Sequence, residues 1–375
     1  MQPSDKVCRG IEGGEGISSE YIMRGGKGSD PGMAMGEFIE IDGSVMEGGG
    51  QILRMSVGLS ALLRKPIRIC KIRAGRASPG LKAQHLTGLT LVRDLTGGKL
   101  DGGEFGSVEV SFRPGQLRSG QFSADTKSAG AVCLLAQVSL PCTLFSPGMV
   151  SLNLRGGTNA MMAPQIDEYT EIFLPNISKF GFEFEFEVVR KGFFPKGGGE
   201  VNFFQKPVKQ LKPISMTDPG VVESIMGWSF TAGNLPLRLA DQMTSAAKQH
   251  LQSADIPALR GVPVSIETYK EDSSCAPHSG SGIVLVAKTS TGCILGGSAL
   301  GGARVSPEET GQRAAEELLE AVDCGGCVDK YIQVRELFIT EEHKTAEVLV
   351  GPDDHLHGPR CWVQHLGDRT YNLAH

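Results

Sequence analysis

The chain has 375 residues, of which 21% are charged, and its formal net charge is −5. This length is more than one compact core usually takes, so two domains are expected. The acidic balance excludes a general electrostatic attraction to nucleic acid, so a contact with RNA or a nucleotide must come from local clusters of arginine. No apolar run is long enough to span a bilayer and no secretory segment follows Met1, which predicts an intracellular protein with no membrane partner.

Residues 1–36 are rich in Gly, Ser, Asp and Glu and show no periodicity, so they are predicted to be a disordered leader. The following segment has the apolar spacing of alternating strands and helices. The predicted elements are a strand over 38–43, a helix over 51–63, a strand over 67–72, a helix over 81–95 and a strand over 107–112.

The same order of elements recurs further along the chain. The second set is a helix over 129–138, a strand over 149–154, a helix over 165–179 and strands over 182–189 and 200–204. Two successive β-α-β-α-β-β units indicate a duplication within an α/β layered domain. Glycine turns at similar places in the two units predict that several loops meet at one cleft.

A Pro- and Gly-rich segment near 213–220 predicts a domain boundary. A small inserted α/β domain is predicted after it, with strands over 221–230, 264–266, 283–287 and 293–295 and a helix over 237–251. A further helix is predicted over 308–322, where Ser306 and Pro307 supply the start signal. From residue 334 onward neither a helical nor a strand rhythm is present.

The stretch from Glu47 to Gln84 contains the clearest candidate site. Three glycines precede the first predicted helix, and backbone N–H groups at such a helix start favour an anion. Arg73 and Arg76 follow in the run Arg-Ala-Gly-Arg and offer forked donors that match phosphate oxygens. The hypothesis is a site for a phosphorylated ligand, with Glu47 as a metal ligand or base. The alternative is a glycine turn before a core helix with solvated arginines, because the run has neither the Walker nor the Rossmann spacing.

Six stretches between residues 37 and 333 together resemble the RNA 3'-terminal phosphate cyclase family. They read IDGSVMEGGGQILR, IRAGRASPGLKAQHLTGL, DTKSAGAVCLLAQVSLP, GGTNAMMAPQIDEY, GFFPKGGGEV and VDKYIQ. The resemblance implies repeated β-α-β-α-β-β units in a large domain with a small α/β domain inserted. The corresponding division is a leader over 1–36, core repeats 1 and 2 over 37–217, the inserted domain over 218–302, the start of core repeat 3 over 303–333, and an aberrant tail over 334–375.

The resemblance also implies an activity, which is the ATP-dependent conversion of an RNA 3'-phosphate end to a 2',3'-cyclic phosphodiester. A histidine accepts AMP from ATP, AMP passes to the RNA phosphate, and the vicinal 2'-OH displaces it. Mg²⁺ or Mn²⁺ and arginines offset the phosphate charges. The family further implies a nuclear or nucleoplasmic location.

The matched motifs imply roles for nine residues of this chain. Gln137, Pro164 and Tyr331 are expected at the ATP pocket. Arg54, Arg73 and Arg76 are expected to bind phosphates, Glu47 to lie near the metal or the nucleophile, and Gln84 and His85 to contact the RNA end.

Each expected site residue also has a purely structural interpretation. Gln137 is then a capped polar residue in a helix, Pro164 a first-turn helix proline, and Tyr331 a core aromatic with a solvated hydroxyl. His85 is then a satisfied partner within its helix. Lys196, beside a glycine run, is at least as well explained as a solvated turn lysine.

After Gln333 the chain departs from the family pattern, which continues with Asp-Gln, an apolar helix and a Gly-Pro-x-Thr-Leu-His segment that holds the AMP-accepting histidine. None of the candidate histidines stands in that context: His343, His355, His357, His365 and His375. If the codons from Asp354 to His375 are read from their second base, they permit IIFMALAVGFSTLGTGPITLH. The tail is therefore interpreted as a frame-shifted translation, with residues 334–352 from inserted sequence.

Three functions are compatible with these features. The leading one is an RNA 3'-phosphate cyclase, which the Arg-Ala-Gly-Arg run, the Ala-Pro-Gln-Ile-Asp run and Tyr331 favour. The alternative is a non-catalytic, cyclase-like RNA-binding factor of ribosome biogenesis, which the missing histidine favours. An enolpyruvyl transferase on the same repeated fold is the weakest, because the motifs resemble the cyclases throughout.

Overall fold

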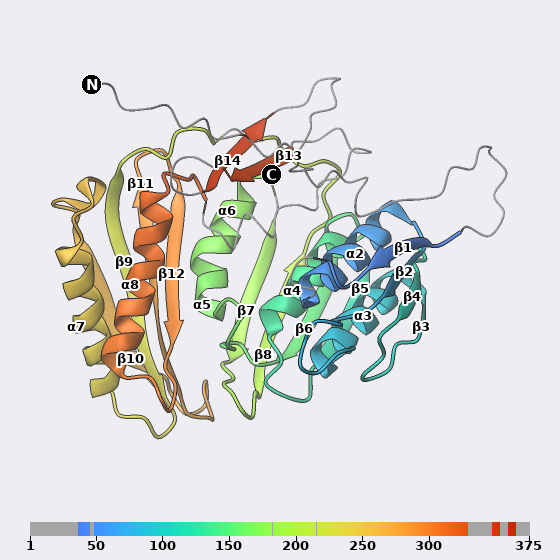
Figure 1. Ribbon diagram of the computed structural model, residues 1–375, viewed down its shortest axis with the longest axis horizontal. Helices are drawn as coiled ribbons and strands as arrows, with labels where there is room; N and C mark the ends of the chain where they lie inside the picture. Colours follow the sequence, from blue (N-terminus) through green and yellow to red (C-terminus); the bar gives the residue numbers. More distant parts are fainter. Residues whose placement is uncertain are drawn as a thin grey trace, which may run out of the picture.

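The protein has a mixed α/β fold, seen in a computed structural model that describes residues 37–45, 49–181, 183–214 and 216–328 (Figure 1). It also describes the backbone of two strands, at 347–352 and 359–364. The described part contains three four-stranded sheets and one two-stranded sheet. The α/β class predicted from the sequence is confirmed.

The first sheet has the strand order β1-β2-β4-β3, with β1 and β2 parallel and β4 antiparallel to both of its neighbours. Its elements are β1 (Ile39–Asp42), α2 (Gly50–Leu63), β2 (Ile67–Cys70), α3 (Ala83–Thr96), β3 (Lys99–Asp101) and β4 (Val110–Arg113). Helix α2 turns Leu53, Val57 and Ala61 inward, at the 3.6-residue period of an amphipathic helix. It ends where Arg64 takes a left-handed conformation.

The second sheet has the equivalent order β5-β6-β8-β7, again with its first two strands parallel and the others antiparallel. Its elements are β5 (Gly120–Asp125), α4 (Val132–Leu144), β6 (Val150–Gly156), α5 (Ile166–Glu168), the π-helical turn η1 (Tyr169–Phe173), α6 (Leu174–Ser178), β7 (Phe184–Arg190) and β8 (Gly199–Gln205). The buried ring of Tyr169 packs on Phe173, Phe186 and Phe203.

The third sheet has a different order, β10-β9-β11-β12, and carries α7 and α8 side by side on one face (Figure 1). Its elements are β9 (Val222–Ala232), α7 (Arg238–Ser253), the 3-10 turn η2 (Pro257–Leu259), β10 (Val264–Lys270), β11 (Gly280–Thr289), β12 (Ile294–Leu300) and α8 (Pro307–Asp323). Helix α8, which the sequence placed in a third core repeat, thus packs in the same layer as α7. The division into domains stays a prediction.

Most predicted elements are present with ends shifted by a few residues. The sequence missed β3 and β5, which are short or mostly exposed and lack a strong alternating pattern. The single helix predicted over 165–179 is interrupted by η1, a local widening that apolar periodicity does not encode. Ser306 caps α8 as predicted, because its Oγ accepts the Glu309 N–H at 3.0 Å.

The tail contains two strands that were not predicted. β13 (Glu347–Pro352) pairs antiparallel with β14 (Pro359–Gln364). Both segments contain valine, and one contains tryptophan, residues with high strand propensity. The absence of strand rhythm predicted after residue 334 is therefore wrong for these twelve positions, because each segment is too short to show a period.

Two large hydrophobic cores organise the described chain, and a third, small cluster contains Phe193, Phe230, Ala232 and Ala276. The larger core joins the first two sheets and includes α2, α3 and α4, which pack against one another. The second core lies between the third sheet and helices α7 and α8. This packing brings together residues of α2, α3 and α4 that are far apart in the sequence.

Candidate active site

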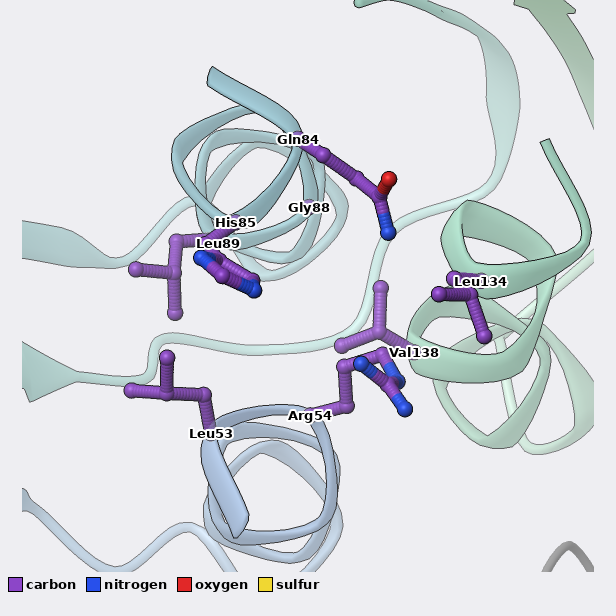
Figure 2. A pocket seen from close by; sticks show the side chains of 8 residues that line it. All are labelled: Leu53, Arg54, Gln84, His85, Gly88, Leu89, Leu134 and Val138. Carbon is purple, nitrogen blue, oxygen red and sulfur yellow. The ribbon is translucent and has the colours of Figure 1, made fainter. Parts of the chain in front are cut away.

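Three helices from two different units surround a small pocket that contains several of the predicted residues (Figure 2). Arg54 projects from α2, while Gln84 and His85 project from the first turn of α3. The rest of the lining is small or apolar: Leu53, Gly88, Leu89, Leu134 and Val138. Polar groups therefore face a pocket with mostly apolar walls, and a less polar environment strengthens their electrostatic interactions.

Arg54 and Gln137 join α2 to α4. The Arg54 Nε–H donates to Gln137 Oε1 at 2.7 Å, and Gln137 is buried. This bond fixes the plane of the guanidinium, so less rotamer freedom is lost when a ligand binds. Gln137 thus has its partner on another helix, and that partner is the arginine predicted to bind phosphate.

His85 is a neutral ring in a cationic environment. Its Nδ1 accepts the Lys82 backbone N–H at 3.1 Å, which assigns the ring proton to Nε2. Burial, with the nearby charges of Arg73, Arg54 and Lys82, lowers the pKa of His85 to about 4. At neutral pH the ring therefore presents Nε2–H as a hydrogen-bond donor without adding charge.

The Nε2 edge of His85 lies against the start of helix α2. A Cβ atom placed on Gly50 would lie 2.5 Å from His85 Nε2 and 3.0 Å from the Arg54 guanidinium. Only a residue without a side chain leaves these groups in place. Because the glycine run has no side chains, His85 and Arg54 can approach the N-terminus of helix α2, where the helix dipole favours an anion.

Gln84 connects α3 to the start of α4. Its Oε1 accepts the backbone N–H of Ala131 at 2.9 Å, and Ala131 is the N-cap residue of α4. The side chain therefore uses its carbonyl oxygen to set the distance between two helix starts. Its amide nitrogen points from α3 toward the pocket side in Figure 2.

The two arginines of the Arg-Ala-Gly-Arg run have different structural roles. Arg73 has a left-handed backbone, and its Nη1 donates to the carbonyls of Ser78 at 2.8 Å and Gly80 at 3.0 Å. It therefore closes the loop before α3, while its charge still acts on His85. Arg76 reaches the glycine run, since a Cβ on Gly49 would lie 3.3 Å from Arg76 Nη2.

Pro164 lies elsewhere, in the segment before α5. The helix N-cap is Gln165, so Pro164 precedes the cap and the alternative interpretation as a first-turn proline is wrong. The neighbouring Gln165 donates from Nε2 to the Ile283 carbonyl of β11 at 3.2 Å, which attaches this segment to the third sheet. Glu47 and Tyr331 lie outside the described residues.

The site as described fits an anion and does not by itself hold a metal. Among residues 37–45, 49–181, 183–214 and 216–328, no group of three His, Cys, Asp or Glu side chains has a metal-binding arrangement. Mg²⁺ commonly binds through substrate phosphates and one or two carboxylates. No chemical step is therefore assigned to a metal from this geometry.

Sequence reasoning missed a second group of charged residues, on the second sheet. Asp125, Arg155, Arg190 and Glu200 line a groove beside the turn that contains Lys196. The glycine turn at 197–199 marked this place in the sequence. The strand residues were missed because their charges become neighbours only when β5, β6, β7 and β8 pair.

The described chain is an α/β protein with a pocket between helix starts whose polar lining is Arg54, Gln84 and His85. A family model described as RNA 3'-terminal phosphate cyclase matches residues 45–340. A protein of that name from Ignicoccus hospitalis is 40% identical over 294 residues, which are 78% of this chain and 82% of the relative. Another from Drosophila melanogaster is 37% identical over 297 residues, which are 79% of this chain and 81% of the relative. A probable RNA 3'-terminal phosphate cyclase of Dictyostelium discoideum is 38% identical over 320 residues, 84% of this chain and 72% of the relative.

The chain therefore belongs to the RNA 3'-terminal phosphate cyclase family, as the sequence motifs predicted. This is a family of ATP-using enzymes that act on RNA 3'-phosphate ends. The matched region includes all nine residues to which the motifs gave a role. None of the helices in the described chain is both long and apolar enough for a membrane span.

Proposed function

We propose that this protein is an RNA 3'-terminal phosphate cyclase that uses ATP to convert an RNA 3'-phosphate into a 2',3'-cyclic phosphodiester. The observation that carries the proposal is the pocket between α2, α3 and α4. There, Arg54 is fixed by Gln137 and the neutral ring of His85 faces the glycine run. This pocket lies within the region that matches the family.

The pocket supplies what phosphate chemistry requires. Attack on a phosphate by a neighbouring hydroxyl is opposed by the negative charge of the phosphate oxygens, so cationic and N–H donors must offset that charge. Arg54 and Arg76 bind phosphate oxygens in our proposal, and His85 donates its Nε2–H to the RNA end. Gln84 positions α3 beside α4 and contributes to the RNA contact. Arg73 holds the loop and adds positive potential.

The remaining roles complete the proposed nucleotide site. Gln137, Pro164 and Tyr331 contact ATP, with Gln137 acting through its bond to Arg54 as well. Glu47 lies near a Mg²⁺ or Mn²⁺ ion that arrives with the ATP phosphates. The closeness of Gln137 to Arg54 supports a nucleotide site that is continuous with the phosphate pocket.

The proposed architecture is a duplicated unit with an insertion. Equal strand orders in the first two sheets support core repeats 1 and 2 over 37–217. The different order of the third sheet supports an inserted domain beginning near 218. We also propose that a third repeat starts at 303, with α8 packed beside α7. We further propose that the protein is located in the nucleus, because the family that its sequence resembles implies this location.

The AMP-accepting histidine is the part of the mechanism that this chain does not match. We propose that the tail is a frame-shifted translation, with residues 334–352 from inserted sequence, and that this form does not become adenylylated. The test is to incubate the full chain with magnesium and ATP labelled in the α-phosphate, then measure acid-labile AMP on protein. The comparison in this assay is a version of the chain in which the reading frame is restored after residue 333.

We expect no label on this chain and label on the restored form. Label on this chain contradicts the interpretation of the tail but supports the enzyme. No label on either protein contradicts the proposed cyclase activity.

The missing histidine favours a second candidate, a non-catalytic cyclase-like factor that binds RNA in ribosome biogenesis. The two candidates differ in their ligand requirement. A cyclase pocket should bind a 3'-phosphorylated RNA more tightly than the same RNA with a 3'-hydroxyl, since Arg54 and His85 recognise the terminal phosphate. Equal binding of the two RNAs supports the non-catalytic factor.

A further inference from the structure

A charged groove of about 410 Å³ lies on the second sheet, separate from the pocket between the helices. Four cationic side chains line it, Lys127, Arg155, Arg190 and Lys196, together with two carboxylates, Asp125 and Glu200. The excess of two positive charges contrasts with the net charge of −5 for the whole chain. The groove is therefore a local cationic surface on an acidic protein.

Glu200 holds the two arginines of the groove in place. Its Oε1 accepts from Arg155 Nε at 3.1 Å and Nη2 at 2.9 Å, and its Oε2 accepts from Arg190 Nη2 at 3.0 Å. Asn153 also donates to Oε1 at 2.8 Å; this bond, with the two arginines, lowers the pKa of Glu200. The arginine side chains remain 53% and 43% exposed, and each guanidinium has five N–H donors. They are oriented, yet accessible to a second anion.

The turn beside the groove contains Lys196, which lines the groove, and an aromatic residue, Phe194, two positions before it along the chain. Lys196 is exposed and has no partner within the described chain. Phe194, two residues earlier, is 76% exposed, which is unusual for a large apolar side chain. Gly197 allows the turn to pack against residue 128, because a Cβ at this position would lie 2.3 Å from the Ser128 carbonyl oxygen.

The groove and the helix pocket lie close together along the chain and in space. Ser128 lines the groove, and three residues later the Ala131 N–H bonds to Gln84 of the helix pocket at 2.9 Å. Three residues span at most about 11 Å. The two sites are therefore close enough for one extended ligand to reach both.

We propose that this groove binds the single-stranded segment of RNA that precedes the 3'-terminal phosphate. Arg155, Arg190 and Lys196 contact its phosphodiester groups, and Phe194 stacks on one of its bases. The combination of a cationic groove with an exposed aromatic ring suits a single strand, since stacking accepts any base. The inference rests on the proposed function, because it assumes that the helix pocket receives the RNA end.

The test compares a long ligand with a short one on the full chain. The long probe is a fluorescent 12-nucleotide RNA with a 3'-phosphate, and the short probe is a fluorescent nucleoside 3',5'-bisphosphate. Dissociation constants come from fluorescence anisotropy at several salt concentrations. The variants are Lys196→Glu and Phe194→Ala, and their matched controls are Lys288→Glu on exposed β11 surface and Val221→Ala at another exposed apolar position.

We expect each groove variant to weaken binding of the 12-nucleotide RNA by about fivefold or more. Binding of the short probe should stay within twofold, and the controls should match the wild type. The slope of log affinity against log salt should fall in magnitude by about 0.7 or more for Lys196→Glu.

Unchanged affinity for the 12-nucleotide RNA in both groove variants overturns the inference, as does an equal loss in Lys288→Glu. Absence of any measurable binding of the RNA also overturns it. If only the preference for a 3'-phosphate is missing while the groove variants still lose affinity, the groove inference stands and the proposed cyclase function fails.

Discussion

His85 shows how a single residue is defined by its surroundings. The sequence allowed either a contact to the RNA end or a satisfied partner within a helix; the structure gives one ring nitrogen a partner at the start of its own helix, and the RNA contact stays a proposal for the other. Nδ1 is satisfied by the Lys82 N–H, whereas Nε2 faces the glycine run. Its low pKa follows from burial among three cations.

The pKa of His85 predicts a dependence of stability on pH. The folded-state pKa of about 4 lies below the usual value of about 6.5, so between these values the unfolded chain binds more protons. The depressed pKa of His85 therefore makes the free energy of unfolding depend on pH. Its contribution is fully present above about pH 6.5 and is lost as the pH falls toward 4. Urea unfolding at pH 5 and pH 7.5 should show a smaller difference for His85→Gln than for the wild type.

The matched control for this measurement is His250→Gln. His250 lies on α7, and its Nε2 is 3.8 Å from Glu316 Oε1. This variant measures the effect of replacing a histidine outside the pocket. If both variants behave alike, the environment assigned to His85 is wrong.

At the scale of elements, the start of α2 combines a glycine run with side chains from other segments. Gly49 makes room for Arg76, and Gly50 makes room for His85 and Arg54. A glycine near the first turn of a helix normally weakens the helix by up to about 1 kcal/mol relative to alanine. Its presence here is explained by the approach of these groups, which the linear sequence does not reveal.

Gly50→Ala should therefore reduce ligand binding more than stability. The new methyl group displaces the ends of His85 and Arg54, while the better helix propensity of alanine offsets part of the strain. We expect a change in unfolding free energy within about 1 kcal/mol and at least a tenfold loss of affinity for an RNA 3'-phosphate. Anisotropy titration and urea unfolding measure the two effects.

The control for Gly50→Ala is Gly302→Ala, where the added Cβ would have ordinary contact with Val305 at 3.8 Å. It should keep the wild-type affinity. An unchanged affinity in Gly50→Ala contradicts the role given to the glycine run.

The pairing of α7 with α8 depends on another glycine. A Cβ on Gly311 would lie 2.2 Å from the Met243 carbonyl oxygen, which is backbone and cannot turn away. Gly311→Ala should destabilise the protein by about 1–3 kcal/mol, because the helices must separate or bend. Thermal and urea unfolding measure this loss, and Gln312→Ala on the exposed face of α8 should stay near the wild type.

At the scale of the whole molecule, a buried polar seam joins the second sheet to the third. Lys191 follows β7, and its Nζ lies 2.7 Å from Asp167 of α5 and 2.6 Å from Glu271 beyond β10. The ammonium also contacts Tyr269 Oη at 3.2 Å. Although burial alone disfavours the charge, the two carboxylates outweigh it and raise the pKa of Lys191.

Lys191→Met should destabilise the protein strongly, because it leaves two carboxylates partly buried without their cation. The expected loss of unfolding free energy is about 3–5 kcal/mol. Lys206→Met removes an exposed pair with Glu183 and should cost no more than about 1 kcal/mol. Equal losses in the two variants would show that the seam does not join the sheets energetically.

The candidate site was only partly predictable from the sequence. The motifs named four residues that the structure brings together. Arg54, Gln84 and His85 line one pocket, and Gln137 bonds to Arg54. The difference between Arg73, which closes a loop, and Arg76, which reaches the glycine run, needed coordinates. The groove at Glu200 was not predicted, because its cations lie on separate strands and on the turn beside them.

The sequence by itself determined the α/β class, most helices and strands, and the family, because apolar periodicity and contiguous motifs are local properties of a chain. The tertiary structure decided which charges become neighbours and how each is used. Contacts of these charged groups depend on strand order and helix packing. They join residues as far apart in the sequence as Arg54 and Gln137, and a sequence pattern does not report how close such residues lie in space. For the same reason the seam at Lys191 and the groove beside Lys196 emerged only when the sheets were assembled.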